Sequence, residues 1–332
     1  MGHTVIIAEA GVNHNGDISI AKKLVDAAKD AGADIVKFQT FDVDSITSKY
    51  AEMAQYQKRN IGQTKSQKEM LSELTLTHEE FIELSEYCKE KAIRFLSTPF
   101  DIPSIRFLVS LGCELWKIPS GEITNYPYLV EIAHTHKDII LSTGMSNLSE
   151  VEAAVKLLKD EGSGKISLLH CTTQYPTPYD SVNLKAMTTL KERTGLDVGY
   201  SDHTKGIEIP IAAVAMGASI IEKHFTLDRK MQGPDHKASL EPYELKEMVE
   251  SIRHIESAFG NGVKSPVDTE KENMSIARKS IVAKCDIKKG ELLTENNLTT
   301  KRPGNGINPM SWKSVLGTKA IRDFGEDELI EI

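Results

Sequence analysis

One pattern limits the folds open to this chain more than any other: a short apolar run, rich in Val and Ile, recurs eight times along it. The eight runs cover residues 5–10, 34–39, 94–98, 115–119, 139–142, 166–172, 197–201 and 219–225. Segments with a helical spacing of apolar residues, such as 18–31, separate the runs, and another, 242–259, follows the last one. Eightfold alternation of strand and helix is typical of a closed parallel (β/α)8, or TIM, barrel. A doubly wound open sheet, the alternative α/β fold, rarely has eight such evenly spaced units.

The sequence changes character after the last helical segment. Residues 260–272 (GNGVKSPVDTEKE) are polar, as in a linker, and short strand-like segments then alternate with turn sequences such as KKGE and RPGNG. We therefore predict a barrel over residues 1–260, a linker over 261–274 and a small, mostly β domain over 275–332. A domain of this size is near the lower limit for independent folding, so we expect it to rest on a barrel, its own or a partner's.

One connection is unusually long. Residues 42–73 are polar and rich in Lys and Gln, and they follow the second expected strand on the face where barrel enzymes carry their catalytic loops. The segment is either a lid over the site or a mobile surface excursion.

Charge and apolar content exclude several classes of protein. The net charge is −8, and the chain lacks the Lys/Arg block that a nucleic-acid binder usually carries. No apolar stretch approaches the roughly 18 residues of a membrane span. The four cysteines stand apart without a CxxC pair, which fits reduced thiols. We expect a cytoplasmic protein that binds neither nucleic acid nor membrane.

Polar side chains stand where the expected strands end, which is where barrel enzymes place their chemistry. Lys37 and Lys117 belong to the second and fourth runs, and Ser120, Ser142 and Ser201 stand at or just after strand ends. An ion pair that only stabilises the fold is the alternative for each lysine alone. Two lysines beside three hydroxyls favour a site for phosphate or carboxylate.

Alternation along a strand tests which of these side chains share a face. Glu9 is on the face of Ile7, and Glu222 is on the face of His224, whereas Lys223 is on the opposite face. We therefore expect Lys223 to have a structural role.

Two histidines occupy matched positions on neighbouring strands. His203 and His224 follow the seventh and eighth runs, and such a pair favours metal ligation, although a lone buried histidine is usually a satisfied core residue. Two protein ligands would leave positions open for water and substrate, as a Lewis acid requires. His14 and His236 stand in turn sequences, so we expect a turn or loop role for each, at the rim of the pocket.

These motifs resemble the sialic acid synthase family, the bacterial synthases of N-acetylneuraminate and related nonulosonic acids. The resemblance runs from Val5 to Gly306. The matching motifs are AEAGVNHNG, VKFQTF, STPF, WKIPSGE, LSTGM, LHCTTQYPTP, GYSDHT, EKHFTLD, GPDH and KRPGNG. The family implies a (β/α)8 barrel followed by a small antifreeze-like (SAF) domain. It also implies a domain-swapped homodimer, in which the SAF domain of one chain caps the barrel of the other.

The resemblance implies a role for each matching residue. His203 and His224 would hold a divalent metal, usually manganese or magnesium, and Glu9 would be the acid/base carboxylate. The residues implied in binding phosphoenolpyruvate are Lys37, Lys117, Ser120, Ser142 and Ser201. The residues implied around an N-acetylated amino sugar are Gln39, Thr98, Phe100, Glu122, Thr173, Tyr175, Asp235 and, from the partner subunit, Arg302. Some family members have Asn at the position of Thr173.

The implied reaction joins phosphoenolpyruvate, an open-chain 2-acetamido sugar and water into a nine-carbon 2-keto acid, with release of phosphate by C–O cleavage. N-acetylmannosamine would give N-acetylneuraminate; the alternative substrate is 2,4-diacetamido-2,4,6-trideoxy-mannose, which would give N,N'-diacetyllegionaminate. A Schiff-base aldolase with Lys117 or Lys37 as nucleophile is a rival enzyme. A non-enzymatic scaffold carrying an ice-adsorbing domain is the other rival, and it predicts no polar pocket at the strand ends.

Overall fold

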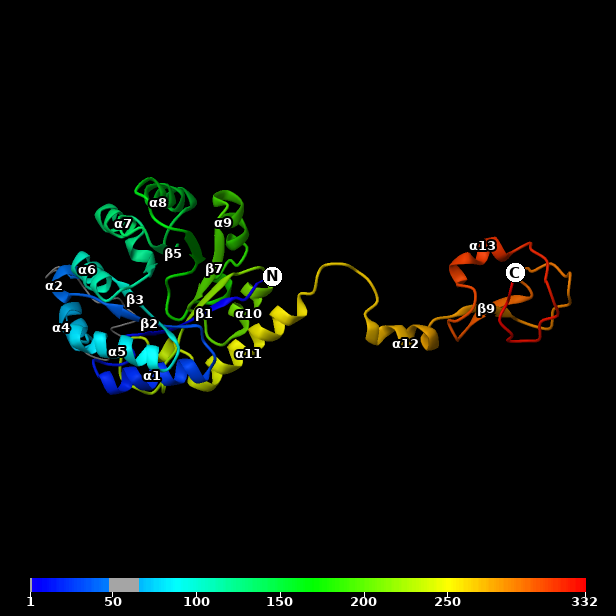
Figure 1. The fold of residues 1–332 in the computed structure, drawn as a ribbon, viewed down its shortest axis with the longest axis horizontal. Coiled ribbons are helices and arrows are strands. Elements are labelled where there is room, and N and C mark those ends of the chain that lie inside the picture. The colour runs from blue at the N-terminus through cyan, green and yellow to red at the C-terminus, as the bar shows by residue number, and fades with distance from the viewer. Residues whose placement is uncertain (1, 48–65) are drawn as a thin grey trace. The chain divides into compact units, whose positions relative to one another are not determined.

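The computed structural model describes residues 2–47 and 66–332. The chain divides into two compact units, Met1–Phe259 and Gly260–Ile332. In the first unit, eight parallel strands are hydrogen-bonded in the order β3-β2-β1-β8-β7-β6-β5-β4, and β3 also contacts β4, so the sheet closes on itself (Figure 1). The strands are β1 (Val5–Gly11), β2 (Ile35–Thr40), β3 (Arg94–Pro99), β4 (Leu115–Ile118), β5 (Asp138–Ser142), β6 (Ile166–His170), β7 (Asp197–Asp202) and β8 (Ile220–His224). The predicted barrel is confirmed, with strand bounds that differ from the eight apolar runs by a few residues at most.

Helices surround the strands (Figure 1). They are α1 (Ile18–Asp30), α5 (His78–Glu90), α6 (Ile102–Ser110), α7 (Tyr126–Ala133), α8 (Leu148–Asp160), α9 (Ala186–Thr194), α10 (Glu208–Ala215) and α11 (Pro242–Ala258). In α1, the side chain of Asp17 caps the first turn by accepting from the backbone N–H groups of Ser19 and Ile20. The chain leaves this helix through Gly32, whose φ of +81° suits a residue without a side chain.

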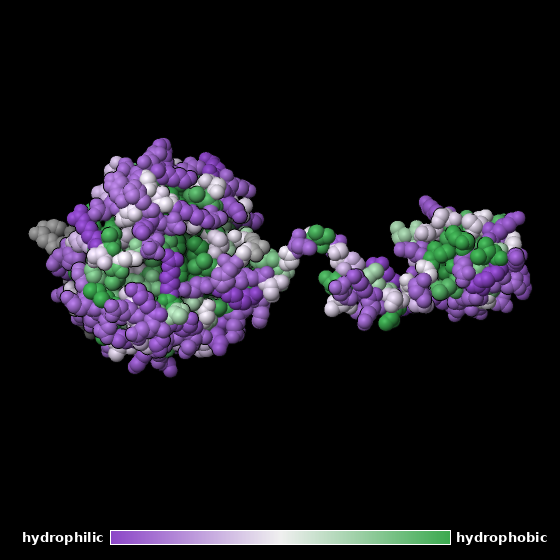
Figure 2. All heavy atoms as spheres, viewed as in Figure 1, coloured by the Kyte–Doolittle hydropathy of each residue, from purple (hydrophilic) through white to green (hydrophobic). Residues whose placement is uncertain are grey.

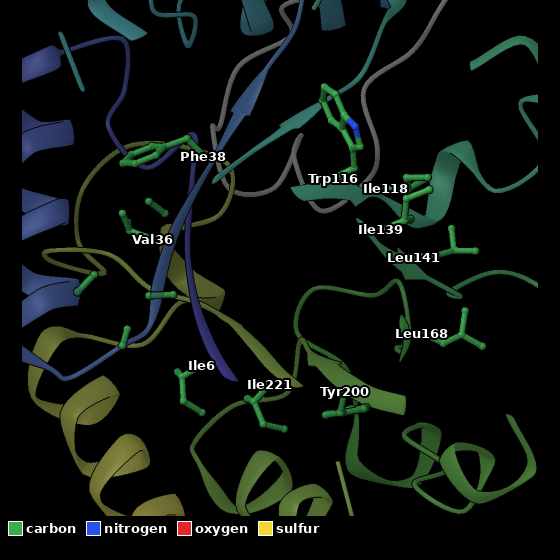
Figure 3. Close-up of a cluster of buried hydrophobic side chains, with 14 of the residues drawn as sticks. Ile6, Val36, Phe38, Trp116, Ile118, Ile139, Leu141, Leu168, Tyr200 and Ile221 are labelled. Atoms are coloured by element: carbon green, nitrogen blue, oxygen red, sulfur yellow. The ribbon is translucent and has the colours of Figure 1, made fainter. Parts of the chain in front are cut away.

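Two apolar layers hold the barrel together. Outward-facing strand residues such as Ile6, Val36, Trp116 and Leu141 pack under the helices (Figure 3). Inward-facing residues fill the interior of the barrel, and they are Ile7, Ile35, Leu96, Ile140, Leu169 and Ile220. Because side chains alternate along each strand, the next inward-facing residue lies two positions closer to the carboxyl end of the strand, and most of these residues are polar. The apolar interior thus ends beneath a polar layer.

The long connection after β2 contributes two short helices, α2 (Val43–Ile46) and α4 (Gln67–Ser72). Ser66 and Glu69 form a capping box at the start of α4. The part of the predicted loop between residues 48 and 65 lies outside the described residues.

The second unit has a core of its own. Strands β9 (Ser280–Ala283) and β10 (Leu298–Lys301) pair antiparallel, and α13 (Trp312–Val315) follows them. The buried core residues are Ile281, Ala283, Ile287, Leu293, Leu298, Val315, Ala320, Phe324 and Ile330. Helix α12 (Asp268–Ala277) begins within the segment predicted as a linker. The SAF-like fold predicted for this region agrees with the antiparallel pair and its small core.

Most of the surface shown in Figure 2 is hydrophilic, because the outer faces of the helices carry charged side chains. None of the helices among the described residues combines the length and apolarity needed to cross a bilayer.

Candidate active site

Four buried charged side chains meet at the carboxyl ends of the strands. The Lys37 ammonium lies 2.8 Å from Glu9 Oε2 and 3.1 Å from Glu222 Oε1. The Lys117 ammonium lies 3.3 Å from Glu222 Oε2. Each of the four side chains is at most 5% exposed. This charge cluster of Glu9, Lys37, Lys117 and Glu222 joins strands β1, β2, β4 and β8.

Strand register explains why these residues meet. Glu9 is the Cα partner of Lys37 on one side and of His224 on the other. Side chains at paired positions of parallel strands lie at one level of the sheet, so they face the barrel interior together.

The two carboxyl groups of the charge cluster have pKa values that are shifted in opposite directions. Burial raises the pKa of Glu9 and the nearby carboxylate of Glu222 adds to this, so Lys37 does not bring the pKa back to its usual value. For Glu222, burial acts in the same direction, but Lys117 and Lys37 together bring its pKa below the usual range. Glu222 is therefore the fixed negative charge, and Glu9 is the carboxyl that can exchange a proton.

The two lysines differ as well. Burial alone would lower the pKa of Lys37, but the carboxylates of Glu9 and Glu222 raise it. Burial lowers the pKa of Lys117, which has one carboxylate partner, Glu222. A buried amine with a lowered pKa is the feature that the rival Schiff-base mechanism needs, so Lys117 is the lysine on which that mechanism would depend.

Hydroxyl groups surround the two ammonium groups. Lys37 Nζ donates to Thr98 Oγ1 at 2.8 Å, and Lys117 Nζ donates to Ser142 Oγ at 2.7 Å. Ser120 Oγ accepts from the backbone N–H of Gly144 at 2.9 Å. Ammonium and hydroxyl donors at such distances can bind an oxyanion.

The two predicted metal ligands lie next to each other. The ring centroids of His203 and His224 are 5.6 Å apart, and the Tyr175 ring lies against both, at 4.3 Å and 5.8 Å. His203 Nδ1 is 2.8 Å from the carbonyl oxygen of Thr172, which places the proton on Nδ1 and leaves the Nε2 lone pair available. Burial lowers the pKa of His203 to about 4 and that of His224 to about 3, so both rings are neutral.

These features fit a divalent cation with few protein ligands. His224 Nδ1 is buried and has no hydrogen-bond partner in the structure. Neutral imidazole nitrogens are good ligands for divalent metals. In the described part of the chain, no three His, Cys, Asp or Glu side chains are arranged around a common metal position. A metal between the two rings would thus take its other ligands from water or substrate.

The predicted residues of the barrel line two adjoining cavities. Those around the inner cavity, of about 200 Å³, are Glu9, Lys37, Gln39, Thr98, Phe100, Lys117, Ser120, Ser142, Thr173, Tyr175, Ser201, His203 and His224. Glu122 and Asp235 line the outer cavity, of about 450 Å³, which shares four residues with the inner one. The shared residues are Gln39, Phe100, Tyr175 and His224.

Arg302 belongs to the other unit. Its side chain is exposed, and its Nε donates to the carbonyl oxygen of Ala277 at 3.0 Å. Its predicted role toward a partner's sugar site stays a prediction.

Three residues outside the predicted site agree only in part with the sequence analysis. Lys223 pairs with Asp202 away from the cavities, in the structural role expected from its position on the strand. His14 accepts from the backbone N–H of Gly16, and His236 bonds Thr226 Oγ1. Neither histidine lines the inner or the outer cavity, so the expectation that both stand at the pocket rim is wrong.

Two features of the site have no role that was predicted from sequence. Glu222 was grouped with His224 by strand alternation, but its contact with both lysines follows only from barrel closure. The residues of α4 that line the outer cavity come from the loop whose role was left open.

Comparison with known proteins places both units. The sequence model of the NeuB family matches residues 24–264, and that of the SAF domain matches residues 278–331. An N,N'-diacetyllegionaminic acid synthase of Campylobacter jejuni is 55% identical over 332 residues, which is 99% of each chain. One of Legionella pneumophila is 49% identical and covers 95% of this chain and 89% of its own. The crystal structure of an N-acetylneuraminic acid synthetase from Leptospira borgpetersenii, in complex with citrate, superimposes with a TM-score of 0.72 at 38% identity, covering 82% of this chain and 90% of the other.

Proposed function

Because the chain belongs to the NeuB family and is a synthase of nonulosonic acids that ends in a SAF domain, we propose that it makes N,N'-diacetyllegionaminate in the cytoplasm. Its substrates are phosphoenolpyruvate, 2,4-diacetamido-2,4,6-trideoxy-mannose and water. The comparisons favour this sugar, the second of the two in the sequence analysis, over N-acetylmannosamine. The observation that carries the chemistry is the meeting of the charge cluster and two neutral imidazoles at one cavity.

The anionic substrate would bind at the two lysines. Phosphoenolpyruvate carries a phosphate and a carboxylate, and among the described residues Lys37 and Lys117 are the lysines that line the inner cavity. Ser142 and Ser120 supply hydroxyl donors beside Lys117. Glu222 contacts both ammonium groups, so its negative charge offsets their repulsion and holds them close together before the anion arrives.

The sugar's aldehyde would lie at the imidazole pair. A divalent metal, manganese or magnesium, would be held by His203 and His224 and would act as a Lewis acid on the aldehyde oxygen. The hydrogen bond from His203 to the Thr172 carbonyl fixes that ring. Tyr175 packs against both rings and limits the space open to the aldehyde.

Glu9 is the residue placed to move a proton. The enol carbon attacks the aldehyde carbon, whose oxygen takes up a proton and becomes a hydroxyl, and water adds at C2 of the former enol. Phosphate then leaves with cleavage of its C–O bond, while the C2 hydroxyl loses its proton and becomes the keto oxygen. Glu9 accepts the proton of that water, as its raised pKa suits. Lys37, 2.8 Å away, holds the Glu9 carboxylate in place. Holding both substrates in adjoining cavities supplies much of the rate by proximity.

Phosphate release tests the proposal directly. Purified protein is assayed with phosphoenolpyruvate and manganese against 2,4-diacetamido-2,4,6-trideoxy-mannose and N-acetylmannosamine in parallel. We expect the diacetamido sugar to give the higher kcat/KM. Better use of N-acetylmannosamine would refute the proposed sugar. Borohydride inactivation in the presence of substrate would instead support the Schiff-base aldolase.

Histidine variants test the metal. We expect His203→Ala and His224→Ala to lose phosphate release and to bind less manganese in equilibrium dialysis. His134→Ala is the matched control, because its side chain is 58% exposed and pairs with Glu161 outside both cavities. Wild-type turnover by either site variant in chelator-treated buffer would refute the metal assignment.

The SAF domain would complete the site from a partner subunit, as the family resemblance implies. The swapped homodimer makes a specific prediction for mixed subunits. In a dimer of one His224→Ala chain and one Arg302→Ala chain, one barrel keeps its histidine and receives an intact arginine from its partner. At a sugar concentration that is limiting for Arg302→Ala, mixing the two variants should therefore raise phosphate release above the sum of the separate proteins, and a mixture that shows no gain would count against swapping.

A further inference from the structure

One side of the outer cavity is apolar although the inner cavity beside it is charged. Its residues are Phe41, Ile46, Met70, Leu71 and Leu74, called here the apolar wall. Met70 and Leu74 are buried against Val12, and Phe41 and Leu71 pack on them. The wall is thus a packed surface contributed by α2, α4 and the residues beside them.

The wall lies beyond the reacting centre. The inner and outer cavities share His224 and Tyr175, so the aldehyde end of the sugar is placed where they join. The inner cavity, of about 200 Å³, must also hold phosphoenolpyruvate. The rest of the sugar chain therefore extends into the outer cavity, of about 450 Å³.

Polar side chains line the outer cavity from the loops after β2, β4 and β8. Glu122, Asn125 and Asp235 come from the β4 and β8 loops and can bond amide or hydroxyl groups of the sugar. The wall comes from the β2 loop, which also contributes polar residues to the cavity (Ser45, Thr47 and Gln67), but the five wall side chains themselves offer only carbon and sulfur surface. A hydroxyl placed against them would lose its water without gaining a partner, whereas a methyl group would gain burial.

We infer that the apolar wall receives the deoxygenated end of the sugar, its C6 methyl group, and so selects 6-deoxy over 6-hydroxy substrates. This deepens the proposed function and rests on it. A hydrophobic pocket discriminates against an added hydroxyl by about 10- to 100-fold, which sets the expected preference.

Two sugars that differ only at C6 measure the preference. They are 2,4-diacetamido-2,4,6-trideoxy-mannose and 2,4-diacetamido-2,4-dideoxy-mannose, compared by kcat/KM for phosphate release. We expect the 6-deoxy sugar to be favoured by about 10- to 100-fold. Equal use of both sugars by the wild-type protein would overturn the inference and leave the proposed synthase activity standing.

A matched pair of variants locates the preference. Leu71→Asn places an amide on the wall at nearly constant size, and we expect it to bring the ratio of the two sugars toward one. Ile82→Asn makes the same change at a residue on α5 that is 43% exposed and lines neither cavity, and it should leave the ratio unchanged. Because both sugars are assayed on one protein sample, a smaller folded fraction cancels from the ratio. An unchanged ratio in Leu71→Asn would refute the role of the wall.

Measurements of sugar binding can test this inference even if the proposed function fails. If no candidate sugar releases phosphate, the proposed function fails. Calorimetric titration of wild type and Leu71→Asn with the two diacetamido sugars then decides the inference alone. Tighter binding of the 6-deoxy sugar that is lost in Leu71→Asn would support the wall, and equal binding of both would overturn it.

Discussion

The buried ion pair of Lys223 and Asp202 lies beside both predicted metal ligands in the sequence, and breaking it should lower the free energy of unfolding. Asp202 directly precedes His203, Lys223 directly precedes His224, and Asp202 and Lys223 are paired across β7 and β8. Both side chains are fully buried. Lys223 Nζ also donates to the carbonyl oxygen of Thr204, so one ammonium fixes the turn that carries His203.

The structure sets the size of the effect. Lys223→Met would leave the Asp202 carboxylate buried with hydrogen bonds from Thr204 but without a cation. Removing one partner of a buried pair lowers the free energy of unfolding by about 3–5 kcal/mol. The control is Lys156→Met, because Lys156 pairs with Asp160 on the surface of α8, with side chains 77% and 58% exposed. Such an exposed pair contributes about 0.5 kcal/mol or less.

Urea unfolding followed by fluorescence measures the difference. Trp116 is fully buried in the barrel unit and Trp312 lies in the other unit, so a Trp312→Phe background reports the barrel alone. Asp202→Asn combined with Lys223→Met should cost less than the sum of the single changes, since no charge then stays unpaired. A Lys223→Met variant as stable as Lys156→Met would refute this reasoning.

Three further predictions concern single charged residues. Burial raises the pKa of Asp235 to about 7, so the contribution of this group to the free energy of unfolding falls as pH rises from about 4 to 7. The free energy of unfolding of Asp235→Asn, measured in urea at pH 5 and pH 8, should therefore rise relative to that of wild type over this range. A difference between the two proteins that stays constant with pH would contradict this. Glu222→Gln removes the carboxylate that Lys37 and Lys117 share, so the Tm of the variant should be lower than that of wild type. Added phosphate should increase the Tm of the variant more than the Tm of wild type. An equal increase in both proteins would argue against the anion site. Arg302→Ala should raise KM for the sugar more than KM for phosphoenolpyruvate in steady-state assays, and equal effects would count against a capping role.

Strand alternation is why so much of the inner cavity could be predicted from sequence. A period of two leaves no choice of face once Ile7 or Ile35 is assigned to the interior, and so Glu9 and Lys37 must follow them inward. The carboxyl ends of parallel strands also meet at one mouth, which brings His203 and His224 together although they are 21 positions apart in sequence.

Loop residues could not be placed in this way. Met70 and Leu71 line a cavity because the chain returns to it after a long insertion, and no period fixes the path of such a segment. The turn residue His236 was expected at the pocket rim, but hydrogen bonds to Thr226 and Asn15 hold it elsewhere. The contacts of a polar turn residue depend on which loops pack together, and that information is not local.

This difference bears on how far sequence motifs can identify a substrate. Changing Glu222 disturbs two buried lysines at once, so the reacting groups are tied to one another by charge and to the barrel by strand register. Changing Leu71 alters apolar area on a wall that makes no ion pair with the charge cluster, so the choice of sugar can change while the condensation chemistry stays the same. Motifs at strand ends therefore determine the reaction class. We expect the choice between 6-deoxy and 6-hydroxy sugars to depend on α4 and its neighbours, where the single substitution Leu71→Asn should shift the ratio of the two substrates.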